Sequence, residues 1–188
     1  MVDVETLLTQ EFHVSSEEVQ KASLYQQRHG GRIEQILVRM GALSSELLPY
    51  FYHQVFDVPL LSADELAVVT ERDDFAQVLQ QAVSEQLRQE WRTAGLYPVN
   101  PHDLLADEQA TVILACLNPT DLTAMDILAS YVERSVALRI CTEEQQTLIE
   151  QASKHEVAQD AGVDLSLLEE DRLRELASEA PTVNLLNN

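Results

Sequence analysis

The chain has 188 residues, of which 45% are apolar and 5% aromatic, which is enough for one large globular domain or two small ones. Its 32 acidic residues outnumber 12 basic ones, and the formal net charge is −20. This charge argues against nucleic acid and anionic lipid as general partners, because proteins bind both through cationic side chains. We find no apolar run long enough for a membrane span and no basic signal region, and we expect a cytoplasmic protein.

Residues 1–29 and 32–61 are predicted to be two copies of one small helical unit. When Val4 is laid on Ile33, Ser15-Ser16-Glu17 falls on Ser44-Ser45-Glu46. The coinciding apolar pairs are Leu7 with Ile36, Leu8 with Leu37, Val14 with Leu43 and Val19 with Leu48. One copy alone could not bury its apolar face, so the two are expected to pack together. We therefore predict a tandem helical domain over residues 1–61.

In the first copy, Ser15 and Glu18 have the spacing of a capping box. This spacing predicts a helix over about residues 16–28, which His29-Gly30-Gly31 should end.

In the second copy, Gly41 is placed to end a short helix, because glycine adopts the left-handed conformation at little cost. Ser44 is a predicted N-cap for the next helix. Pro59 favours an extended Val58, so that helix should end before it.

Residues 62–153 are predicted to form a small α+β domain with a three- or four-stranded sheet. Helical spacing of apolar residues predicts one helix that ends at Trp91, a core residue, and Pro98 suits an edge strand. Thr142 is expected to cap the last helix. The expected elements are a connection (62–74), a helix (75–91), a strand (96–99), a polar loop (100–109), a buried strand (111–117), a turn (118–121), a helix (122–132), a strand (135–141) and a helix (143–153).

The remaining residues, 154–188, are interpreted as an acidic linker. Leucines at roughly helical spacing predict an amphipathic helix over residues 164–177 within it.

The sequence contains no recognisable catalytic motif. A P-loop needs Gly-x4-Gly-Lys-Ser/Thr, and neither Lys21 nor Lys154 follows a glycine, so this chain should not hydrolyse ATP. The five scattered histidines lack ligand spacing, and we predict no metal site and no cofactor. Cys116 and Cys141 lack CxxC spacing and are interpreted as free thiols of a reducing compartment. The acidic pairs Asp73-Asp74 and Glu143-Glu144 are interpreted as solvated acids at helix starts rather than a catalytic pair.

Arg32 is the one cation at the turn between the two helical copies. A guanidinium beside helix N-termini can hold an anionic ligand. The competing interpretation is an ion pair with a nearby acid such as Glu34.

Several of these patterns together resemble the N-terminal region of the assembly ATPases of type II secretion and type IV pilus systems. Residues 32–61 resemble the MshE N-terminal-like domain, the helical domain found in the ATPase of the mannose-sensitive haemagglutinin pilus. The matching residues there are Arg32-Ile33, Ile36-Leu37, Gly41, Leu43, Leu48 and Val58-Pro59-Leu60-Leu61. Further on, the matches are Leu96-Tyr97-Pro98-Val99, Val112 to Leu117, Asn118-Pro119-Thr120-Asp121-Leu122, Met125-Asp126-Ile127-Leu128 and the tail Glu179 to Asn187, which is similar to the segment that opens the ATPase core.

The resemblance implies a non-catalytic portion of such an ATPase that recruits its ATPase core to the cytoplasmic domain of an inner-membrane secretion or pilus protein. We then expect a location peripheral to the inner membrane and an ATPase core beyond residue 188. The candidate partner-binding face is on the second helix of the second copy and comprises Leu47, Leu48, Phe51 and Tyr52.

The alternative that the resemblance implies is cyclic di-GMP binding by the tandem unit, with Arg32 and Gly41 as the candidate nucleotide-binding residues. This sequence departs from the family's pattern. Glu34 replaces a glycine of the second copy, and the glutamine position falls on Val55. A carboxylate at that place blocks close backbone approach and repels a phosphate. The first copy has Asp3, Glu5 and Phe12 at the Arg and two Gly positions.

Overall fold

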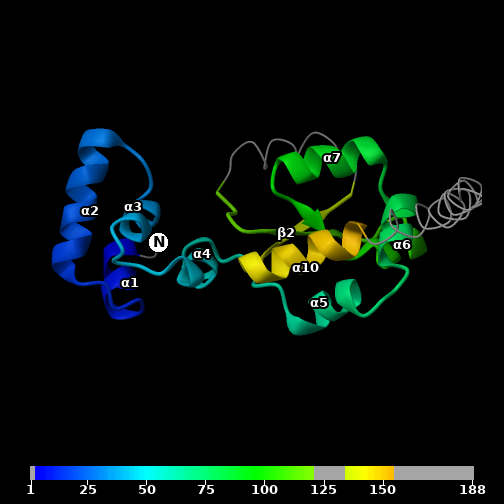
Figure 1. The fold of residues 1–188 in the computed structure, drawn as a ribbon, viewed down its shortest axis with the longest axis horizontal. Helices are drawn as coiled ribbons and strands as arrows, with labels where there is room; N and C mark the ends of the chain where they lie inside the picture. The colour runs from blue at the N-terminus through cyan, green and yellow to red at the C-terminus, as the bar shows by residue number, and fades with distance from the viewer. Residues whose placement is uncertain (1–2, 121–133, 155–188) are drawn as a thin grey trace, which may run out of the picture.

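The computed structural model describes residues 3–120 and 134–154, which form a helical unit followed by a unit built on a small sheet (Figure 1). The architecture is therefore α+β, as predicted. The helical unit contains α1 (Val4–Gln10), α2 (Ser16–His29), α3 (Ile33–Arg39), the 3₁₀ turn η1 (Ser45–Leu47) and α4 (Leu48–Phe56). The second unit contains α5 (Ala63–Thr70), α6 (Phe75–Ala82), α7 (Glu85–Thr93), β1 (Tyr97–Pro98), α8 (Pro101–Ala106), β2 (Val112–Cys116), β3 (Val136–Ile140) and α10 (Glu143–Lys154).

The helical unit repeats the same backbone turn after its first and third helices. After α1, Glu11 N–H donates to the Leu7 carbonyl at 2.9 Å and Val14 N–H to the Leu8 carbonyl at 3.0 Å. After α3, the matching bonds run from Met40 to Ile36 at 2.9 Å and from Leu43 to Leu37 at 3.3 Å. The two copies also share one apolar core, so the predicted tandem unit is confirmed. The fully buried members are Leu7, Leu8, Val14, Val19, Ala22, Ile36, Leu37, Leu43, Phe51, Tyr52 and Ile140.

The predicted helix ends are confirmed, except that Ser44 caps a 3₁₀ turn rather than α4 itself. Ser15 and Glu18 form the capping box of α2. Gly41 has φ +74° and directly follows the cap of α3. Ser44 caps the turn η1, which leads into α4. Asp57, with φ 54°, ends α4 one residue before Val58.

Three predictions for the second unit are wrong. Residues 62–74 were expected to connect the domains, but Ser62 and Glu65 form a capping box that starts α5. Residues 75–91 form two helices rather than one, because Val83 is extended and the Ser84 side chain caps α7 by accepting from Leu87 N–H. Residues 100–109 contain α8, which begins with Pro101 at its first position. Proline suits that position because its missing N–H would have no helical partner there.

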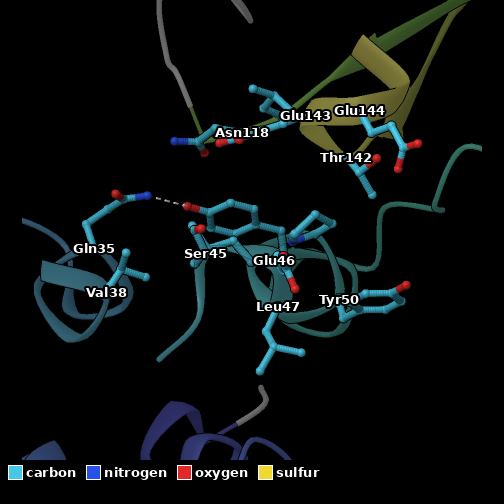
Figure 2. A pocket seen from close by; sticks show the side chains of 14 residues that line it. Gln35, Val38, Ser45, Glu46, Leu47, Tyr50, Asn118, Thr142, Glu143 and Glu144 are labelled. Carbon is cyan, nitrogen blue, oxygen red and sulfur yellow. Dashed lines mark hydrogen bonds between the residues drawn. The ribbon is translucent and has the colours of Figure 1, made fainter. Parts of the chain in front are cut away.

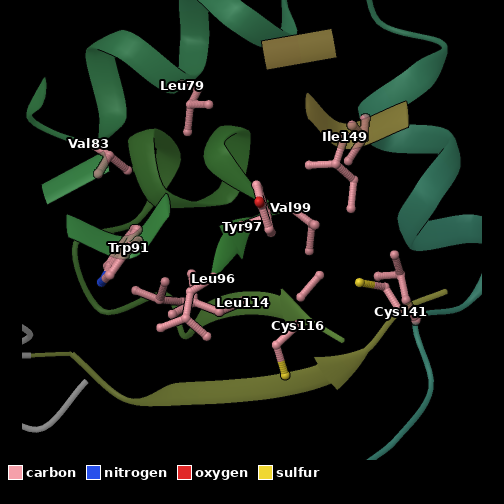
Figure 3. Packing of buried hydrophobic residues seen from close by; sticks show 14 of the residues in the cluster. Leu79, Val83, Trp91, Leu96, Tyr97, Val99, Leu114, Cys116, Cys141 and Ile149 are labelled. Atoms are coloured by element: carbon pink, nitrogen blue, oxygen red, sulfur yellow. The ribbon is translucent and has the colours of Figure 1, made fainter. Parts of the chain in front are cut away.

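The predicted strands are confirmed, and the described sheet has the order β1-β2-β3. β1 is an antiparallel edge strand that carries Pro98, whereas β2 lies in the middle and runs parallel to β3. Helices surround this sheet, and Trp91, Leu114, Val99 and Ile149 meet in the resulting core (Figure 3). Thr142 and Gln145 cap the start of α10 reciprocally. Asn118 accepts a bond from Thr120 N–H, as expected for the predicted turn. The predicted helices 122–132 and 164–177 and the tail lie outside the described residues.

The two units are joined at the end of β3. Ile140 N–H donates to the Pro59 carbonyl, and Leu61 N–H donates to the Ile140 carbonyl, both at 2.8 Å. Leu60 thereby forms a parallel bridge beside the sheet. The Ile140 side chain is fully buried and packs in the core of the helical unit. One residue of the second unit therefore completes the core of the first.

This join gives a direct prediction for Ile140→Ala. Removing the buried side chain should cost about 2–5 kcal/mol of unfolding free energy and weaken the contact between the units. Trp91 fluorescence reports the second core, and far-UV circular dichroism reports both units. In urea unfolding, we expect these two transitions to coincide for the parent chain and to separate for Ile140→Ala. Val136→Ala, at the half-buried opposite end of β3, is the control. Coincident, unshifted transitions in Ile140→Ala would show that the Ile140 side chain does not hold the two units together.

Candidate functional site

Arg32 lies at the N-cap position of α3, between the two helical copies. Its Nε is 2.5 Å from Glu34 Oε1. Its guanidinium lies over two aromatic rings of α4, 5.7 Å from the Tyr52 centroid and 5.9 Å from the Phe56 centroid. An ion pair and two cation–π contacts therefore already engage this cation. The interpretation of Arg32 as the partner of Glu34 is the one that the geometry supports.

The acid of this pair is buried. Only 3% of Glu34 is exposed. Its Oε1 also accepts a bond from the Tyr52 hydroxyl at 3.4 Å, and that hydroxyl accepts from Gln35 Nε2 at 2.9 Å. Burial raises the pKa of Tyr52, which keeps the hydroxyl protonated and able to donate. A phosphate that approached Arg32 would have to displace or neutralise the Glu34 carboxylate.

Gly41 makes no contact with Arg32. The two residues flank opposite ends of α3, which a rise of 1.5 Å per residue separates by roughly 13 Å. A Cβ placed on Gly41 would meet no atom within 4 Å. Its positive φ accounts for the glycine, because other residues are strained in that conformation.

The predicted partner-binding face is largely turned inward. Phe51 is 2% exposed and Tyr52 is 1% exposed, and the Phe51 ring meets the Phe12 ring edge-on at 5.7 Å. Leu48 is half-buried. The apolar face of α4 is thus the one that closes on the first copy, and Phe51 and Tyr52 are core residues rather than free surface. Leu47 stays exposed, and its neighbour one turn on is Tyr50, which the sequence analysis did not select.

A cleft of about 860 Å³ lies between the two units (Figure 2). The helical unit contributes residues of α3, η1 and α4, and the second unit contributes the end of β2 and the start of α10. The lining residues are Gln35, Val38, Ser45, Glu46, Leu47, Leu48, Pro49, Tyr50, Tyr52, Leu117, Asn118, Thr142, Glu143 and Glu144. We call it the inter-unit cleft. Sequence reasoning missed it, because the segments that form it lie far apart along the chain.

The inter-unit cleft is lined by both apolar and acidic side chains. Figure 2 shows Glu143, Glu144 and Thr142 on the wall opposite Gln35 and Val38. Glu46 and Tyr50 belong to the α4 side. None of the described residues that line it is Lys, Arg or His. The start of α10 contributes a partial positive charge of about one half, which the two glutamates in its first turn outweigh.

The other features give no evidence of reactive chemistry. Within residues 3–120 and 134–154, no group of three or more His, Cys, Asp or Glu is placed to hold a metal ion. Cys116 and Cys141 are free and buried, and burial raises the pKa of each thiol to about 12, so both are protonated and unreactive near neutral pH. No helix in the described ranges has the length and apolar character needed to cross a bilayer.

The fold is similar to that of a solved structure. The structure of MshE with cdg matches at a TM-score of 0.56 and 20% identity, over 82% of this chain and 99% of that chain. The N-terminal domain of XpsE matches at a TM-score of 0.41 and 19% identity, over 76% of this chain and 89% of that chain. No protein-family model and no curated protein sequence matches the chain. The MshE match confirms the fold that the sequence resemblance implied, a helical unit followed by a small α+β unit.

The Arg32–Glu34 pair predicts unequal costs for removing its two members. Arg32→Met leaves a buried carboxylate without its cation and should cost about 3 kcal/mol of unfolding free energy. Glu34→Gln leaves a neutral amide that still accepts from Tyr52, with Arg32 partly exposed, and should cost about 1 kcal/mol. Urea denaturation of both variants, and of the double variant, measures the difference. Equal costs, or a larger cost for Glu34→Gln, would show that the pair is not the internal ion pair described.

Proposed function

We propose that this chain is the non-catalytic N-terminal docking portion of a secretion or pilus assembly ATPase. Residues 1–61 and 62–153 would be its two domains, and residues 154–188 a linker to the ATPase core of the same chain. The portion would recruit that core to the cytoplasmic domain of an inner-membrane protein. The protein would then be cytoplasmic and held at the inner membrane through its partner.

The observation that carries this proposal is the fold match to MshE over nearly the whole length of the matched chain. The order of sequence motifs agrees with it, from Arg32-Ile33 to the tail at Glu179. The net charge of −20 also favours a protein partner over a nucleic acid or anionic lipid.

The surface that supports docking lies on η1 and α4. Leu47 is 37% exposed and Tyr50 is 49% exposed, one turn apart on the rim of the inter-unit cleft. Tyrosine is enriched among the residues that carry binding energy at protein interfaces, and the exposed Leu47 adds apolar area beside Tyr50. The interface proposed here therefore uses Leu47 and Tyr50 instead of the buried Phe51 and Tyr52.

Cyclic di-GMP binding at Arg32 is the alternative, and the matched MshE structure is one with cdg. The geometry around Arg32 disfavours it in this chain. The guanidinium pairs with the buried Glu34 carboxylate, and Gly41 lies at the other end of α3. We therefore propose that the tandem unit serves here as a docking fold rather than as a nucleotide sensor.

The docking proposal predicts that this chain binds the cytoplasmic domain of the membrane protein of its own secretion or pilus system. Leu47→Ser should weaken binding about tenfold, because it removes an exposed apolar anchor without opening the core. Leu105→Ser is the matched control, since Leu105 is 47% exposed on α8 of the second unit. Biolayer interferometry measures both affinities.

The absence of binding by the parent chain at tens of micromolar would overturn the docking proposal. An equal loss of affinity in Leu47→Ser and Leu105→Ser would overturn the assignment of the interface to Leu47 at the end of η1.

A further inference from the structure

The side chains that line the inter-unit cleft give it a negative charge. Glu46, Glu143 and Glu144 are all exposed, and they reach the cleft from both units. Three carboxylates around one concave space create a negative potential that solvent screens less than on a convex surface. The described residues that line the space provide no cation to neutralise it. The electrostatically matched occupant is therefore cationic.

The lining of the cleft favours an occupant that carries more than charge. Val38, Leu48, Pro49 and Leu117 line the cleft alongside the polar groups. A lysine or arginine can lay its aliphatic stem along apolar surface and keep its charged head beside a carboxylate. A neighbouring apolar side chain of the same segment would cover the apolar surface that the stem leaves exposed. Free metal ions and polyamines supply charge without this apolar surface.

The size of the cleft limits the occupant to a short segment. About 860 Å³ accommodates a few side chains, which is the range of pockets that hold one drug-sized molecule. The acidic surface of this chain makes a second copy of itself a poor occupant, because like charges would meet.

We propose that the inter-unit cleft binds a short cationic amphipathic segment of the partner protein, in which Lys or Arg residues flank an apolar side chain. Glu46, Glu143 and Glu144 receive the cations, and apolar lining residues such as Leu48 and Leu117 receive the apolar side chain. This inference rests on the proposed docking function and adds the place and the chemistry of the contact. A segment seated there touches both units, so its binding also reinforces the join at Ile140.

The test uses the full chain and a fluorescently labelled helical peptide that carries lysines and leucines on one face. Two counterpart peptides replace either every lysine with glutamate or every leucine with alanine. The cleft variant is Glu46→Gln/Glu143→Gln/Glu144→Gln. The matched control is Asp64→Asn/Glu71→Gln/Asp73→Asn, which removes the same net charge from exposed acids outside the cleft. Fluorescence anisotropy gives the affinities.

We expect the parent chain to bind the lysine–leucine peptide more tightly than it binds either counterpart peptide. The cleft variant should bind it about tenfold more weakly, and the control variant within about twofold of the parent. Equal weakening in both variants would mean that net charge alone attracts the peptide, and would overturn the proposal. Undiminished binding of the alanine peptide would also overturn it, because the apolar lining residues would then contribute nothing.

Binding of the membrane partner's cytoplasmic domain to the parent chain and to the cleft variant separates this inference from the docking proposal. If the parent chain and the cleft variant bind the membrane partner's cytoplasmic domain equally well, docking stands and the cleft is not its site. If that domain does not bind the parent chain while the peptide still depends on the cleft glutamates, recognition by the cleft stands and the proposed partner is wrong.

Discussion

The structure depends on the join that Ile140 makes between the two units. Its backbone N–H and carbonyl hold residues 59–61 against the end of β3, and its side chain fills the core of the helical unit. Arg139 adds an ion pair at 2.8 Å to Glu65 at the start of α5. The residues that follow β2 and β3 form one wall of the inter-unit cleft, so the join also fixes where that wall lies relative to α4. A looser join would leave two small folds without a shared binding surface.

How much the sequence predicts depends on whether the signal is local. The tandem copies were predictable because paired apolar positions and the Ser15 and Ser44 caps repeat in the same order. Strand β2 was predictable because a short run apolar on both faces suits a central strand. The capping box of α5 at Ser62 and the Pro101 start of α8 were also local signals, but these short helices carry a weak apolar period. The break at Ser84 has no glycine or proline to mark it, so the stripe of α6 and α7 reads as one helix.

The features of the candidate sites were likewise predictable only where the sequence signal is local. The pairing of Arg32 with Glu34 was one of two interpretations from the sequence, and the two residues are only two positions apart. The structure supports this pairing. Which face of α4 stays exposed was not a local question, because Phe12 of the first copy packs on Phe51 and the shared core buries both Phe51 and Tyr52. Glu46 and Glu143 line the same inter-unit cleft, and no spacing in the sequence indicates that they do. Glu143 and Glu144, interpreted from sequence as acids that stabilise a helix start, retain that role and also line the cleft.

Arg32 is engaged within the fold, and the proposal that this tandem unit docks a protein rather than senses a nucleotide rests on that engagement. Isothermal titration calorimetry of the full chain with cyclic di-GMP tests it most directly, with Arg32→Ala as the matched variant. We predict no saturable heat from either protein, because the Arg32 guanidinium of the parent chain is paired with Glu34 and the variant has no guanidinium. Saturable heat from the parent chain that Arg32→Ala abolishes would contradict it.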